Sequence, residues 1–91
     1  MKLSDKVKAI RVAEGLSQAA FCKIIDLPLP TLKKYEANSY EPSGVNLMKI
    51  TQHERFSKYT LWLMTDKTAP EVGQVSPAIA HTGQNTTESA R

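Results

Sequence analysis

The sequence predicts an all-α fold, with a compact domain of five helices over residues 1–66 and a disordered C-terminal tail over residues 67–91. Residues 16–42 contain two short amphipathic segments joined by a tight turn, and apolar residues recur at helical spacing on both sides of them. From Lys67 onward bulky apolar residues become rare, so this segment is not expected to bury enough surface to order itself. A chain of 91 residues has room for a single core.

The first helix is expected to cover residues 4–14, with Gly15 placed to end it. Its apolar positions share one stripe at helical spacing: Leu3, Val7 and Ile10. Three lysines, Lys2, Lys6 and Lys8, lie off that stripe. Their position favours a solvated face over contacts with phosphate.

The second helix is expected to begin after Ser17, whose hydroxyl can accept hydrogen bonds from the free amides of a first turn. Leu16 and Phe21 flank it as a hydrophobic staple. With Gln18 as the first position of a helix-turn-helix, five later positions must be apolar and one must be small. The apolar positions hold Phe21, Ile25, Leu27, Leu32 and Tyr35, and the small position holds Cys22.

The third helix follows two prolines and is expected over residues 29–37. A residue before proline is disfavoured in helical geometry, so Leu27 and Leu29 are expected to be extended. Pro30 suits a position in the first turn of the helix. Leu32 and Tyr35 would then point inward, while the outer side carries Pro30, Lys33, Lys34 and Ala37.

These residues resemble the Cro and phage-repressor family of helix-turn-helix regulators. The resemblance rests on Leu16-Ser17-Gln18, on Leu32-x-x-Tyr35-Glu36, and on Asn38 and Pro42 beyond them, and it covers about residues 3–66. It implies a lambda-repressor-like domain that binds double-stranded DNA. At the turn, where the family prefers glycine, this chain has Asp26, which tolerates left-handed backbone geometry better than most residues.

The resemblance also implies which residues contact DNA, with the outer side of residues 29–37 facing the major groove. The predicted contacts are Gln18, Leu29, Pro30, Thr31, Lys33, Lys34, Asn38, Ser39 and Tyr40. Leu29 and Pro30 can offer only apolar contact to thymine methyl groups, whereas the lysines can bond guanine or phosphate. The alternative to a DNA contact is that Gln18 is simply a solvated residue in the first turn of its helix.

An arginine at the position of Arg11 pairs, in the resembled family, with a glutamate that corresponds to Glu36. The resemblance therefore implies a structural salt bridge between the first and third helices. The alternative is that either residue is simply exposed.

A fourth helix is expected over residues 43–52 and a fifth over residues 56–64. The fifth has more bulky apolar side chains than one buried stripe needs, and an exposed apolar face on a small domain needs a partner. Trp62 is assigned to the core. The predicted dimer interface consists of Phe56, Tyr59, Leu61 and Met64.

Composition limits the other function classes. The net charge is +3, and residues 1–65 carry ten Lys or Arg against six Asp or Glu, a modest basic excess that agrees with a nucleic-acid partner. One cysteine excludes an internal disulfide, and two histidines form no cluster for a metal, so no metal or cofactor is expected. No nucleophile with a base, carboxylate pair or phosphate loop suggests an enzyme. Without a signal peptide or an apolar run of transmembrane length, a cytoplasmic protein is expected.

The sequence thus predicts a small transcriptional regulator, most simply a repressor that binds an inverted-repeat operator as a homodimer. Two alternatives share the fold. One is an antitoxin whose tail or fifth helix binds a toxin partner, and the other is a protein-interaction module that no longer reads DNA.

Overall fold

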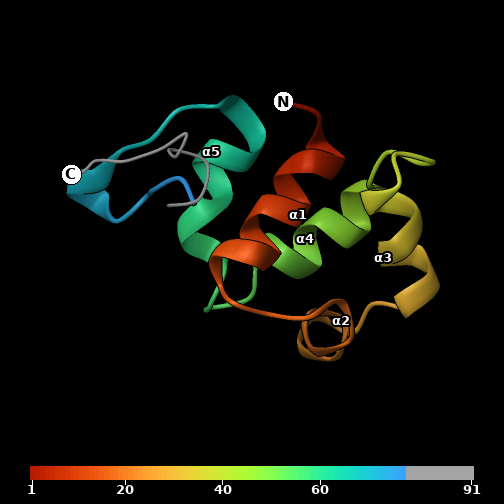
Figure 1. The fold of residues 1–91 in the computed structure, drawn as a ribbon. Helices are drawn as coiled ribbons and strands as arrows, with labels where there is room; N and C mark the ends of the chain where they lie inside the picture. The colour runs from red at the N-terminus through yellow and green to blue at the C-terminus, as the bar shows by residue number, and fades with distance from the viewer. Residues whose placement is uncertain (78–91) are drawn as a thin grey trace.

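The computed structural model describes residues 1–77, and within this range five α-helices and two short 3-10 helices make up the regular structure, which confirms the predicted all-α fold. The α-helices are α1 (Leu3–Ala13), α2 (Gln18–Ile25), α3 (Leu29–Glu36), α4 (Gly44–Thr51) and α5 (Thr60–Thr65). The 3-10 helices are η1 (Ser57–Tyr59) and η2 (Pro70–Val72). Helices α1 and α4 lie between α3 on one side of the molecule and α5 on the other (Figure 1).

The helix ends follow from residues with a clear physical role. The Ser17 hydroxyl accepts a 3.0 Å hydrogen bond from the amide of Ala20, and the Ser43 hydroxyl accepts one of 3.2 Å from Asn46, so both residues cap the helix that follows. Gly15 takes a positive φ of 70° just beyond α1, in the left-handed region where glycine carries no Cβ penalty.

Helix α3 begins at Leu29, as the predicted range has it, but the backbone conformation of Leu29 differs from the prediction. Leu29 is the first helical residue rather than an extended one, with Pro28 as the N-cap and Pro30 in the first turn. A first turn has no partner for its amides, so the missing N–H of Pro30 costs no hydrogen bond there. The side chain of Leu29 packs against the core, and this packing offsets the unfavourable pairing of helical geometry with a following proline.

The core joins the helix-turn-helix to the chain before α5. The fully buried side chains Phe21 and Phe56 meet edge to face, with ring centroids 5.2 Å apart and planes at 66°. The predicted fifth helix is divided into η1 and α5, with Phe56 as the N-cap residue of η1 and Tyr59 as its last residue. These two residues are 0 % and 5 % exposed, so the prediction that they lie on the surface for a dimer contact is wrong.

Lys6 also differs from its prediction. Only 4 % of the residue is exposed, and its ammonium donates 3.2 Å hydrogen bonds to the carbonyls of Trp62 and Leu63 at the end of α5. The same group pairs with Asp66 at 2.7 Å, and this hydrogen bond lowers the pKa of the Asp66 carboxyl. A lysine that satisfies the last carbonyls of a helix also complements the helix dipole, so Lys6 joins α1 to α5.

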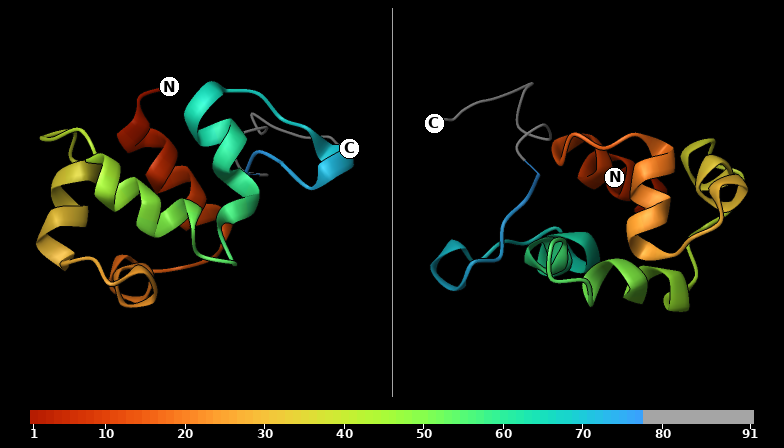
Figure 2. Two further views of the ribbon diagram at one scale, coloured as in Figure 1. Left: turned by 180° about the vertical axis from the view of Figure 1, so that it is seen from behind. Right: turned by 90° about the horizontal axis from the view of Figure 1, so that it is seen from below.

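The ordered domain continues past the predicted boundary at residue 66. Residues 67–77 turn back along α5 and η1 (Figure 2), where the Val75 amide donates to Lys58 O at 2.9 Å. The side chain of Gln74 accepts from the Leu61 amide at 3.0 Å and donates to Ser57 O at 3.1 Å. One of these hydrogen bonds joins two backbone groups and the other two use the Gln74 side chain, so the apolar composition of the segment could not reveal them. The rest of the predicted tail, residues 78–91, lies outside the described residues.

None of the helices between residues 1 and 77 is long and apolar enough to cross a bilayer.

Candidate nucleic-acid interface

The turn between α2 and α3 is fixed from both sides. Asp26 adopts the left-handed conformation, with φ 56° and ψ 55°, at the position where the resembled family prefers glycine. The ammonium of Lys49, on α4, donates a 2.7 Å hydrogen bond to the carbonyl of Asp26. Leu27 is buried directly after the turn, and Cys22 is buried in α2, where burial raises the pKa of its thiol. Apolar packing and the hydrogen bond from Lys49 therefore both hold the turn between α2 and α3 in place.

Helix α3 has an inner and an outer side, as predicted. Leu32 and Tyr35 are buried, and the Tyr35 hydroxyl accepts a 2.7 Å hydrogen bond from Asn46 of α4. The outer side exposes Pro30, Lys33, Lys34 and Ala37. Thr31 and Leu29 are half-buried, and Leu29 packs partly on the core. The helix thus presents two lysines on a side that no other part of residues 1–77 covers.

A network of three polar side chains connects α3 to α1 and α2. Arg11 donates to the two carboxylate oxygens of Glu36 at 2.7 and 2.9 Å, and to Leu16 O at 2.8 Å. The amide of Gln18 donates to Glu36 at 3.0 Å. The side chains of Arg11 and Glu36 are 14 % and 6 % exposed, so both charges are largely removed from water and paired in a bidentate geometry. This network fixes α3 to α1 and to the first turn of α2.

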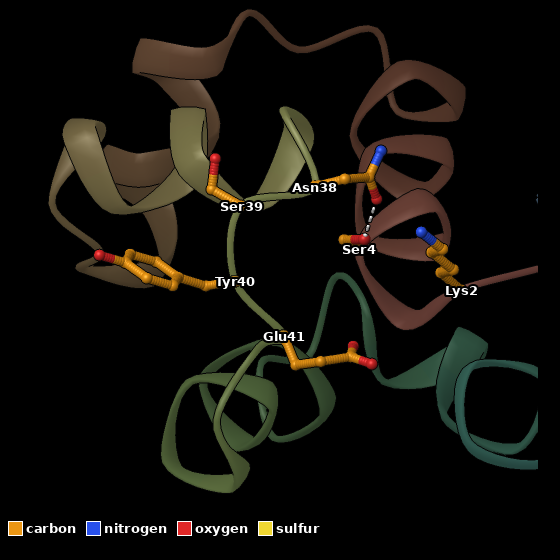
Figure 3. Close-up of a pocket in the computed structure, with 6 residues that line it drawn as sticks. All are labelled: Lys2, Ser4, Asn38, Ser39, Tyr40 and Glu41. Atoms are coloured by element: carbon orange, nitrogen blue, oxygen red, sulfur yellow. Dashed lines mark hydrogen bonds between the residues drawn. The ribbon is translucent and has the colours of Figure 1, made fainter.

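The three predicted contacts after α3 lie on one exposed loop. Asn38 has a φ of 62° and follows the C-cap residue Ala37. Its side-chain oxygen accepts a 2.7 Å hydrogen bond from Ser4, and Ser39 and Tyr40 extend the loop toward solvent (Figure 3). The ammonium of Lys34 lies 5.3 Å from the centre of the Tyr40 ring, within range of a cation–π contact.

The predicted dimer residues separate into two groups. Met64 is 54 % exposed and Leu61 is half-buried, whereas Phe56 and Tyr59 belong to the core. The Tyr59 hydroxyl donates a 2.6 Å hydrogen bond to Glu14. Burial, and after it this hydrogen bond, raise the pKa of Tyr59.

Glu14, at the end of α1, is the centre of a second charged cluster. Besides the Tyr59 hydroxyl, it binds Arg55 at 2.9 Å and Lys58 at 3.1 Å. Burial by itself would raise the pKa of Glu14, but the hydrogen bonds from Tyr59, Arg55 and Lys58 outweigh it and lower the pKa to about 2.

Several residues that position the interface could not be found from the sequence. Ser4, Asn46 and Lys49 come from α1 and α4, and each contacts α3 or the turns at its two ends. They are ordinary polar residues at unremarkable helix positions, so only the tertiary fold indicates what they do.

Comparison with known proteins agrees with this geometry. The family model described as helix-turn-helix matches residues 7–53, slightly more than half of the chain, and this range contains α2, α3, the turn between them and α4. The chain therefore belongs to the helix-turn-helix family and is a DNA-binding transcriptional regulator.

One relative gives a more particular likeness. The chain is 42 % identical over 87 residues to repressor protein C of Escherichia phage P2, a match that covers 96 % of this chain and 88 % of that protein. The similarity extends beyond the helix-turn-helix into the C-terminal part of the chain.

Proposed function

We propose that this regulator is a transcriptional repressor that binds an inverted-repeat operator as a homodimer, with α3 as the recognition helix. The observation that carries the proposal is the outer side of α3. There Lys33 and Lys34 are exposed, while the buried Leu32 and Tyr35 and the Arg11–Glu36 pair hold the helix in place. The likeness to a protein named a repressor supports the direction of regulation.

The proposed contacts divide by chemistry. Pro30 and the accessible part of Leu29 can pack against thymine methyl groups, whereas Thr31, Lys33 and Lys34 can reach base edges or phosphates. One N–H of the Gln18 amide is taken by Glu36, so a contact with phosphate would use the second N–H on the same nitrogen. Gln18 is then both a brace for Glu36 and a contact to the DNA backbone.

The proposed dimer contact uses the outer side of α5, centred on Met64 with the half-buried Leu61 beside it. Helix α5 lies on the side of the molecule away from α3 (Figure 1), so association there would leave both recognition helices free. Two such helices related by a two-fold axis would meet successive major grooves about 34 Å apart.

Selection of bound duplexes from random DNA tests this proposal directly. We expect an inverted repeat with half-site centres about 10 base pairs apart, together with a dimer by sedimentation at micromolar concentrations. Met64→Glu should shift the protein to monomer and weaken binding to the paired site, while Val45→Glu, an exposed apolar position on α4, is the matched control. A monomeric wild-type protein that selects a single unrepeated half-site would contradict the dimer.

The antitoxin alternative placed a toxin partner on the C-terminal segment or on the fifth helix. Residues 67–77 pack on the protein's own η1 and α5, and this gives the alternative no support in the described part of the chain.

A further inference from the structure

The hydroxyl of Ser4 makes a contact that the helix-turn-helix itself does not require. Ser4 is 3 % exposed, and its hydroxyl donates a 2.7 Å hydrogen bond to the side-chain oxygen of Asn38, 34 residues later. A buried hydroxyl is normally hydrogen-bonded. Here the acceptor belongs to an exposed residue at the carboxyl end of α3, so a core group of α1 controls the geometry of a surface amide.

The backbone of Asn38 is fixed as firmly as its side chain. Its φ is 62°, its amide donates to Tyr35 O at 2.9 Å, and the next amide, of Ser39, donates to Lys34 O at 2.9 Å. These bonds close the end of α3 in the manner of a left-handed cap. The backbone hydrogen bonds thus fix the position of Asn38, and the hydrogen bond from Ser4 fixes the direction of its side chain.

The hydrogen bond from Ser4 also decides which end of the Asn38 amide is available. A carboxamide has an acceptor oxygen and a donor NH2 group, and Ser4 occupies the oxygen. The nitrogen of Asn38 is therefore directed away from Ser4, as Figure 3 shows, on a residue that is exposed to solvent. The group that Asn38 offers to a ligand is a pair of N–H donors.

With one exception, the polar residues around this amide favour the binding of a phosphate of the DNA backbone. Lys2 and Ser39 line the same hollow as Asn38 and add an ammonium and a hydroxyl, while Glu41 adds a carboxylate that opposes an anion. A recognition helix reads bases with its amino-terminal residues. Its carboxyl end, where this hollow lies, is then placed beside the phosphates that flank the groove.

We propose that Ser4 is a positioning residue for DNA binding, which orients Asn38 so that its amide nitrogen donates to a backbone phosphate beside Lys2. This inference rests on the proposed function of α3. Because a phosphate contact carries no base information, the contribution of Asn38 is the same for every DNA sequence. Ser4 contributes only through Asn38.

Two substitutions of Asn38 isolate its donor. Asn38→Gly removes the side chain and keeps the positive φ, whereas Asn38→Asp keeps the acceptor for Ser4 but replaces the NH2 group with a charged oxygen. We expect the glycine variant to bind about three- to tenfold more weakly on operator and non-operator DNA alike, as for one lost hydrogen bond. The aspartate variant should lose roughly tenfold or more, because its charge repels phosphate.

Ser4→Ala tests the positioning role through a double-mutant cycle. In the wild-type background it should weaken DNA binding by an amount no larger than that of Asn38→Gly, and in the Asn38→Gly background it should have no further effect. Denaturant unfolding of every variant corrects the affinities for any change in the folded fraction. Ser57→Ala, a serine beside α5 that is remote from α3, should leave the affinity unchanged.

Glu41→Gln provides a gain of function, since removal of the opposing carboxylate should tighten binding to all sequences. If the losses of DNA-binding affinity from Ser4→Ala and Asn38→Gly add in the double variant, the positioning role of Ser4 is overturned. If the Asn38→Asp protein binds DNA as tightly as wild type, the phosphate contact of Asn38 is overturned. Failure of the wild-type protein to bind any duplex would instead overturn the proposed function, so the two failures are distinguishable.

Discussion

Two helices, α3 and α5, pack on opposite sides of α1 and are held to it in different ways. α3 is held by the bidentate pair of Arg11 and Glu36, whose positions the family resemblance implied. α5 and η1 are held by Lys6 and Glu14, which no motif indicated. A short motif constrains residues close together in the chain, whereas a polar residue of α1 that reaches a helix more than 40 positions later leaves no local pattern.

The largest effect is expected on the α5 side, from Phe56→Ala. Phe56 is fully buried against Phe21, so its truncation should lower the free energy of unfolding by about 3–5 kcal/mol. Chemical denaturation measures this value. Val72→Ala, in η2, is the control in the same half of the molecule, because Val72 is 72 % exposed and its truncation should change stability by less than about 0.5 kcal/mol. Equal effects of the two substitutions would contradict the assignment of Phe56 to the core.

On the α3 side, Arg11→Met should cost about 3 kcal/mol of stability, because it leaves the carboxylate of Glu36 buried without its cation. Lys58→Met removes one partner of Glu14, but Lys58 is half-exposed and Glu14 keeps two others. Its cost should stay below about 1 kcal/mol. Thermal unfolding of both variants measures the two costs. An Arg11→Met protein as stable as wild type would show that the pair of Arg11 and Glu36 does not hold α3 in place.

Low pH should weaken the contacts that hold η1 and the chain around it to α1, because Glu14 becomes protonated. Its pKa falls from 4.5 in the unfolded chain to about 2 in the folded protein, so the unfolded chain binds the proton more tightly. The resulting stability, about 3 kcal/mol at most, is complete above pH 4.5 and is lost as the pH falls toward 2. Glu14→Gln should flatten this part of the stability curve. An unchanged slope between pH 4.5 and 2 in the variant would show that other carboxylates cause the acid sensitivity.

The smallest effect is a gain of stability at the turn of the helix-turn-helix. Asp26 holds a positive φ that suits glycine better, so Asp26→Gly should stabilise the protein by about 1 kcal/mol. The hydrogen bond from Lys49 is made to the backbone carbonyl and survives the substitution. Asp66→Gly, also at positive φ, is a contrasting control because it removes the partner of Lys6. A destabilised Asp26→Gly protein would mean that the aspartate side chain has a structural role of its own.

The sequence predicted the helices and the two sides of α3 because these depend on periodicity and capping within short segments. Ser17, Asp26, Leu32 and Tyr35 all occupy the positions that their chemistry indicated. The sequence does not predict the burial of Phe56 and Tyr59, because an excess of bulky apolar residues does not tell which of them face the core.

Polar contacts between residues far apart in the sequence could not be predicted either. Lys6 looks like any exposed lysine until the end of α5 is placed beside it. Gln74 and Val75 dock through amide and backbone hydrogen bonds, which composition does not record. For the same reason, the sequence does not predict the contact between Ser4 and Asn38.

The central claim, that the outer side of α3 enters the major groove, is tested most directly by salt titrations of Lys33→Ala and Lys34→Ala. Affinity for a selected operator and for the same operator with mutated half-sites would be measured at several salt concentrations, with Lys67→Ala, an exposed lysine after α5, as the control.

For a lysine that touches phosphate, we predict weaker binding to all sequences and a salt slope smaller by about 0.9. For a lysine that bonds guanine, we predict a loss of about 1–3 kcal/mol confined to operators with that base. If neither substitution changes the affinity, the sequence preference or the slope, then α3 does not enter the groove and the account of DNA recognition given by this fold is wrong.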